Sequence, residues 1–148
     1  MVSVKQIHFI EEHWEAIARR ALARIRLELP HSHVFSDALI LERVEDLFGH
    51  LGDWLAGAHP EHMIAYEQFG YARATGRVRL HDLVRMLQIL RQCAIDYVRE
   101  NELRDSSITL RSENELEYNV HRFFDLVLCH VVKGYEEALL ENPAVHAK

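Results

Sequence analysis

The sequence predicts an all-helical domain of about five helices, packed as a helical bundle or in a globin-like manner, with no sheet. The chain of 148 residues holds only six glycines and three prolines, too few for the many turns of a β-sandwich. Apolar residues recur at spacings of three and four, which is the period of an amphipathic helix. The length indicates one domain, over residues 1–141, followed by a tail, residues 142–148, that we expect to fray.

The first helix is expected over about residues 4–28. Ser3 and Gln6 have the spacing of a capping box at its start. Pro30 ends it, because the residue before a proline disfavours the helical conformation. The apolar positions of this helix follow a single stripe: Ile7, Ile10, Trp14, Ile17, Ala18, Ala21, Leu22 and Ile25.

The second helix is expected over 36–56, with Ser36 as its cap. Gly49 and Gly52 lie inside it and weaken its last two turns. The third helix should span 60–75, and Gly76 should take the left-handed conformation that ends a helix. Gly70 should let the third helix approach a neighbour closely.

The fourth helix is expected over about 80–103 and has the most regular apolar stripe. Ser112 and Glu115 predict the start of a fifth helix that runs to about residue 140. The stripes together predict these core residues: Ile10, Trp14, Ile17, Leu47, Leu51, Leu83, Leu87, Leu90, Phe124, Val127 and Val131.

Composition excludes several classes of protein. A net charge of −6 argues against nucleic acid as a partner, because phosphate binding needs a basic surface. The apolar runs are too short to span a membrane, and no signal peptide is recognisable. Cys93 and Cys129 are too few for a disulfide framework, so we expect a cytoplasmic protein with both thiols in its core.

Residues 71–99 carry six arginines and two aspartates, a local charge of +4 within an acidic chain. Two interpretations stay open. The arginines form ion pairs with neighbouring acidic helices, or they mark a surface for an acidic partner. Arg73 and Arg91 are the candidates for holding an anionic ligand, since a guanidinium can fork onto a carboxylate or phosphate.

Eleven histidines raise the questions of metal and haem. His31, His33, His59 and His62 are the candidate metal ligands, but no carboxylate or cysteine stands at a recognised ligand spacing beside them. The helical histidines His62, His81 and His121 are the candidates for an axial haem ligand. We expect no cofactor. No nucleophile motif or phosphate-binding loop occurs, and we expect no enzymatic activity.

The segment from Phe69 to Arg91 resembles a family pattern through Gly70, Arg73, Gly76, Leu83, Leu90 and Arg91. The pattern is that of the N-terminal sensory domains of RsbT co-antagonist (RsbR-type) stress-response regulators and related sensor histidine kinases. Trp14 with Arg19 and Arg20 is similar to the opening run of that family. The resemblance implies a haem-free, all-helical sensory domain of bacterial signal transduction that dimerises and acts on an output module. The alternative is a haem-binding or small-ligand-binding globin-like protein.

The fifth helix is apolar over more than one face, which is typical of a buried helix. We therefore predict a homodimer with the fifth helix at its interface and the first helix as a second candidate element. The interface residues expected on the fifth helix are Phe123, Leu126, Val127, Val131 and Tyr135. The competing interpretation is that the fifth helix is the central core helix of a monomer.

Overall fold

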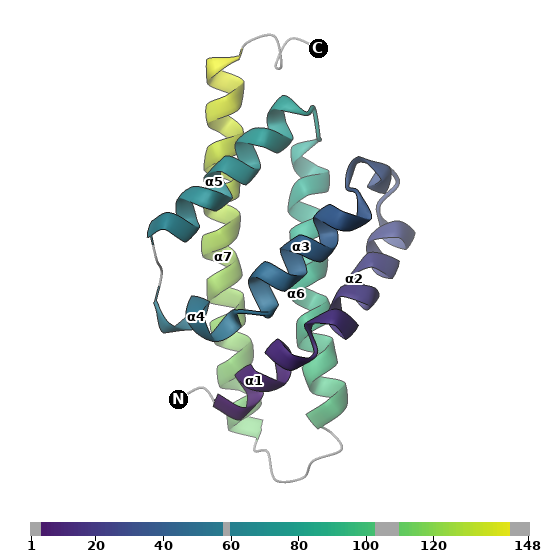
Figure 1. The fold of residues 1–148 in the computed structure, drawn as a ribbon, viewed down its shortest axis with the longest axis vertical. Coiled ribbons are helices and arrows are strands. Elements are labelled where there is room, and N and C mark those ends of the chain that lie inside the picture. Colours follow the sequence, from purple (N-terminus) through teal and green to yellow (C-terminus); the bar gives the residue numbers. More distant parts are fainter. Residues whose placement is uncertain (1–3, 58–59, 103–109, 143–148) are drawn as a thin grey trace.

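The computed structural model describes residues 4–57, 60–102 and 110–142 and is helical throughout (Figure 1). The described residues hold seven α-helices and one short 3₁₀ helix, Ser32–Val34, and no strand. The α-helices are α1 (Val4–Glu12), α2 (Trp14–Glu28), α3 (Asp37–Phe48), α4 (Leu51–Ala56), α5 (Pro60–Thr75), α6 (Leu80–Glu102) and α7 (Leu110–Glu141). The all-helical class is confirmed, but the count of about five helices is wrong because two expected helices are each divided.

The first division falls at His13, between α1 and α2. The His13 amide donates to the carbonyl oxygens of both Phe9 and Ile10, and its ring Nδ1 lies 2.8 Å from the same Phe9 oxygen. The ring also packs against Phe9, with 4.3 Å between the ring centroids. The Phe9 carbonyl oxygen thus contacts both the amide and the ring of His13 where α1 ends. Beyond this break, α1 packs on α4 and α6, while α2 packs on α3 and α6.

The second division falls at Gly49 and His50, between α3 and α4. The Trp54 indole donates to the Asp46 carbonyl oxygen, which satisfies an acceptor in the last turn of α3. The Gly52 amide at the start of α4 donates to the Glu11 carboxylate, 2.8 Å away on α1. A carboxylate at a helix N-terminus stabilises it, so side chains distant in sequence support both ends of the break.

The other predicted helix ends are confirmed in part. The Ser36 hydroxyl accepts from the Leu39 amide and caps α3. Leu29, before Pro30, is extended and ends α2. Ser3 lies outside the described residues, and α7 begins at Leu110, before the Ser112 expected to cap it.

The left-handed residue that ends α5 is Arg77, with φ of 62°, and not Gly76. The Arg77 amide donates to the Ala74 carbonyl and the Val78 amide to the Arg73 carbonyl. This pair of bonds is a Schellman motif, whose C′ residue is left-handed. The motif therefore sits one residue later than the glycine suggested.

The two longest helices, α6 and α7, form an antiparallel pair that runs the length of the molecule (Figure 1). The helices α1 and α2 pack on α6, while α4 and α5 pack on α7. The closest approach is between α5 and α7, where a Cβ at Gly70 would overlap the Val131 carbonyl oxygen. A Cβ at Gly134 would likewise overlap the Glu67 carbonyl oxygen. The predicted role of Gly70 is confirmed.

The core lies where these helices meet, and it contains ten of the eleven residues that the apolar stripes predict for it. Trp14 is the exception, since it is only partly buried against the core. The stacked rings of Phe48 and Phe124, 5.6 Å apart, join α3 to α7 at its centre. In the described residues no helix combines the length and the apolar character needed to cross a bilayer.

Candidate interaction surface on the C-terminal helix

The two predicted ligand-binding arginines have different surroundings and no contact with each other among the described residues. The Arg73 guanidinium on α5 lies over the Phe69 ring, 5.2 Å from its centroid. Arg91 on α6 is 3.6 Å from the Asp125 carboxylate on α7. The Nε atom of each is buried and lacks a hydrogen-bond partner in the described part of the chain. Arg73 and Arg91 lie on different helices, α5 and α6, and their role in holding an anionic ligand stays a prediction.

The arginine-rich segment makes ion pairs with acidic residues on neighbouring helices. Arg85 is 3.3 Å from Glu28 on α2, and Arg99 forms two hydrogen bonds with Glu117 on α7. Together with Arg91, half of the six arginines pair in this way. The interpretation as interhelical ion pairs is therefore confirmed for these three.

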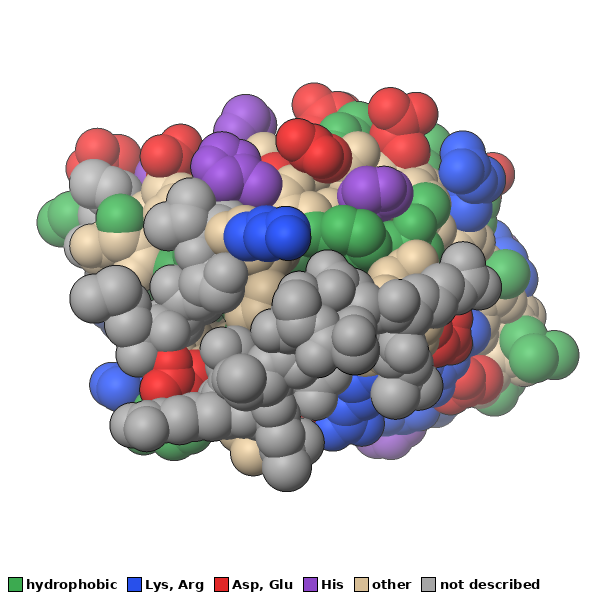
Figure 2. Space-filling view, turned by 90° about the horizontal axis from the view of Figure 1, so that it is seen from below, with side chains coloured by type: hydrophobic (Ala, Val, Ile, Leu, Met, Phe, Trp, Pro, Cys, Tyr) green, Lys and Arg blue, Asp and Glu red, His purple; other side chains and the backbone are tan. Residues whose placement is uncertain are grey.

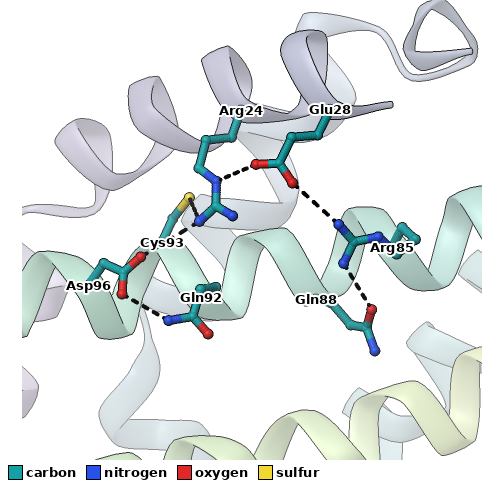
Figure 3. A network of polar contacts seen from close by, with 7 residues as sticks. All are labelled: Arg24, Glu28, Arg85, Gln88, Gln92, Cys93 and Asp96. Carbon is teal, nitrogen blue, oxygen red and sulfur yellow. Dashed lines mark hydrogen bonds and ion pairs between the residues drawn. The ribbon is translucent and has the colours of Figure 1, made fainter. Parts of the chain in front are cut away.

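A polar network joins α2 to α6 (Figure 3). Arg24 donates from Nε to Glu28 and also lies 3.6 Å from Asp96, while Arg85 reaches the other Glu28 oxygen. The hydrogen bond from Arg24 holds the pKa of Glu28 below its usual value. These side chains are between 32% and 39% exposed, so the network orients the two helices more than it stabilises them.

Cys93 lies at the inner end of this network, with its Sγ 3.9 Å from Arg24 Nη1. Burial raises the pKa of the Cys93 thiol, and the nearby Arg24 charge offsets this only in part. A buried, protonated thiol is a poor nucleophile. Cys93 is a core residue as predicted, whereas the prediction for Cys129 is wrong because that thiol is exposed on α7.

His130 is a residue that sequence reasoning did not single out as a site. Its Nδ1 lies 2.7 Å from Glu67 Oε2 on α5, and Lys133 Nζ is 3.5 Å from the same oxygen. The hydrogen bond from His130 lowers the pKa of Glu67. The cluster stands directly beside the close contact at Gly134, so it fixes the register of α5 on α7. No spacing signal links residues 63 positions apart in the sequence.

Within the part of the chain that the structure describes, the candidate metal ligands are not gathered into a metal site. Histidines lie beside acidic side chains at one end of the molecule (Figure 2). Yet among the described residues no group of three or more His, Cys, Asp or Glu side chains could hold a metal ion. The exposed His31 and His33 rings are 6.3 Å apart, His62 packs on Trp54, and His59 lies outside the described residues.

The candidate haem ligands lie on three different helices, α5, α6 and α7. His81 is exposed beside Asp82, and its side chain has 81% of its surface accessible. The His62 ring is 4.3 Å from the Trp54 ring, and His121 is half-buried on α7. None of the three lines the wide groove described next.

An open groove of about 520 Å³ runs along α7, bordered by α4 and the start of α5. Trp54 and Met63 form its floor with Phe123, and Leu126 and Cys129 stand on its α7 edge. Arg122 and Asp125 bring one charge of each sign to that edge. The groove combines apolar walls with a polar rim, which is the usual anatomy of a protein interface.

The predicted dimer interface needs correction at four of its five residues. The structure buries these four within the protomer: Phe123, Val127, Val131 and Tyr135. Tyr135 donates its hydroxyl to the Val78 carbonyl, and the helices α4, α5 and α6 cover the rest of that face. Side chains already buried have no surface left for a second copy. Only Leu126, 37% exposed, is accessible.

Comparison with known proteins gives no match. No family model fits the chain, and neither a curated protein nor a solved structure is similar to it.

Proposed function

We propose that the chain is a non-enzymatic sensory or regulatory domain of bacterial signal transduction. It acts by forming a homodimer and by contacting an output module. The resemblance of residues 69–91 to RsbR-type sensory domains gives the class of function. The all-helical fold agrees with that class but is shared with many others.

The observation that carries the proposal is the double role of α7. One face of this helix packs in the core against α4, α5 and α6. The other face is open and borders the groove at Leu126 and Cys129. A partner bound to the open face therefore contacts the same helix that organises the core, and a shift of α7 changes its packing on α5 and α6. Such a helix can pass a signal between a surface and a core.

A complementation experiment tests this function. In the bacterium that encodes the chain, deletion of the gene should change the transcriptional response to stress. Wild-type protein should restore that response, while Leu126→Arg should not, because a charge on the α7 edge blocks the contact. Leu27→Arg is the matched control, since Leu27 is 85% exposed on α2.

The fold of both variants is checked by circular dichroism. Full restoration by Leu126→Arg, or a deletion strain with an unchanged response, would contradict the proposal. Sedimentation equilibrium of the wild-type chain tests the homodimer separately: a single species of 17.3 kDa at all micromolar concentrations would refute it.

A further inference from the structure

The exposed face of α7 is complementary to itself. We propose that two copies of the chain pair through this face in antiparallel orientation, with Cys129 opposite Cys129 at the two-fold axis. This inference rests on the homodimer proposed above and gives it a surface, an orientation and a register.

The residues that carry the inference share one line on the helix surface. At about 3.6 residues per turn, positions 118, 122, 125, 129, 133, 136 and 140 all fall within roughly 40° of Cys129. All are exposed, and Tyr118 and Leu140 have 61% and 81% of their surface accessible. We call this set the α7 stripe.

The order of side chains along the α7 stripe makes the stripes of two copies complementary when the helices are antiparallel. When position 129 faces position 129 in an antiparallel pair, every residue n faces residue 258 − n of the second copy. Arg122 then faces Glu136, and Asp125 faces Lys133. The two exposed apolar residues at the ends, Tyr118 and Leu140, also face each other. A two-fold axis makes each of these contacts twice.

Charge selects the antiparallel orientation over the parallel one. In a parallel pair in register, Arg122 would face Arg122, and Lys133 and Glu136 would likewise meet their own charge. Like charges in direct opposition disfavour an interface, whereas complementary ones fix its register.

The contacts within the protomer leave these charges available. Asp125 is 3.6 Å from Arg91 but keeps 74% of its side-chain surface accessible. Lys133 is 3.5 Å from Glu67 and is 58% accessible. Arg122 lies over the Tyr118 ring, 5.7 Å from its centroid, so it already points along the α7 stripe.

The groove beside the α7 stripe adds apolar area to the same face. Its α7 edge includes Leu126, and its floor includes Trp54 and Phe123. The stripe from position 118 to 140 is about 33 Å long at ~1.5 Å per residue. A stable dimer buries above ~1,000 Å² in total, and the groove extends the α7 stripe sideways, since Arg122, Asp125 and Cys129 belong to both.

A charge-swap experiment at Arg122 and Glu136 tests the register. These two residues are about 21 Å apart on one helix at ~1.5 Å per residue, so they cannot rescue each other within a protomer. Arg122→Glu alone, and Glu136→Arg alone, should each raise the dimer dissociation constant roughly tenfold in sedimentation equilibrium at low salt. The double variant Arg122→Glu with Glu136→Arg should return it to within about threefold of wild type.

Cross-linking with a short bismaleimide tests the position of the axis. Cys129 is exposed and Cys93 is buried, so the reagent reports on Cys129 in the native protein. A dimer band should form in wild type and in Cys93→Ala, and should be lost in Cys129→Ser. All variants are first compared with wild type by circular dichroism.

The possible outcomes separate this inference from the homodimer itself. A wild-type chain that stays monomeric would overturn both. If the single swaps do not change the dissociation constant of a stable dimer, or the double swap does not restore it, the α7 register is wrong. The homodimer itself would not be contradicted by that result. A dimer without the Cys129 cross-link would overturn the position of the axis.

Discussion

At the scale of single residues, the left-handed Arg77 is the clearest strain in the backbone. Its φ of 62° is costly for any residue with a Cβ, by roughly 1–2 kcal/mol. Arg77→Gly should relieve this cost. After subtracting the greater chain entropy of an unfolded glycine, we expect about 0.5–1 kcal/mol of added stability.

Urea unfolding measures the gain at Arg77. Arg77→Ala is the matched control, because it removes the same exposed side chain but keeps the Cβ and hence the strain. Equal stability of the two variants would show that the left-handed conformation costs nothing here.

Tyr66 gives a prediction for the pH dependence of stability. Burial, together with the charge of Asp46, raises the pKa of Tyr66 well above its ordinary value, and its hydroxyl donates to Asp46. A group whose pKa is raised on folding stabilises the fold fully below its unfolded pKa, about 10 for tyrosine. That stabilisation is lost as the pH rises through the folded pKa. The chain should therefore lose stability above about pH 10.

Tyr66→Phe isolates this effect from other groups that titrate in alkali. The variant should be less stable than wild type near neutral pH by about 1 kcal/mol, since Asp46 loses its donor. The difference between the two proteins should shrink as the pH rises above 10. Urea unfolding at pH 7.5 and 10.5 measures both, and a difference that stays constant would contradict the prediction.

At the scale of elements, the contact between α5 and α7 depends on two glycines that exclude any side chain. Gly70→Ala would place a Cβ on the Val131 carbonyl oxygen, which is backbone and cannot rotate away. Alanine gains about 1 kcal/mol of helix propensity, but separating two packed helices costs about 1–3 kcal/mol or more. Because the Cβ would overlap backbone, we take the upper end of this cost, about 3 kcal/mol, and expect a net loss of about 2 kcal/mol.

Gly52→Ala on α4 is the control, because it adds a Cβ to a helix away from the contact between α5 and α7. The new Cβ would lie 3.1 Å from a Glu11 carboxylate oxygen and 3.5 Å from Ile7 Cγ2, which are side-chain atoms that can move. Thermal unfolding should show a lower midpoint for Gly70→Ala and little change for Gly52→Ala. A Gly70→Ala protein as stable as wild type would mean that α5 and α7 are not in such close contact.

Helix positions were predictable from the sequence, but the divisions between them were only partly so. Glycines at 49 and 52 signalled the break between α3 and α4. The break at His13 has no glycine or proline, and no spacing in the sequence indicates the contact between the His13 ring and the Phe9 carbonyl oxygen. The hydrophobic periodicity also shows that α7 is apolar on more than one face, but it does not show which helices pack on each face. The sequence therefore predicts Phe123 and Val127 at a dimer interface, whereas in the structure α4, α5 and α6 bury that face.

At the scale of the whole molecule, association should make stability depend on protein concentration. A partner that binds only the folded chain raises the free energy of unfolding by about 2.7 kcal/mol when its concentration is a hundred times the dissociation constant. For a chain of this size, each kcal/mol raises the unfolding midpoint by roughly 2–4 °C. Between about 1 and 100 times the dissociation constant, the midpoint should therefore rise by several degrees.

The variant Arg122→Glu supplies the control for this effect, because it weakens the α7 contact without touching the core. In dilute solution its unfolding temperature should equal that of wild type. As the protein concentration increases, its unfolding temperature should rise less than that of wild type. Differential scanning calorimetry over a hundredfold range of concentration measures both proteins. A wild-type midpoint that does not change over that range would show that folding is complete in the single chain, with α7 acting only as its central core helix.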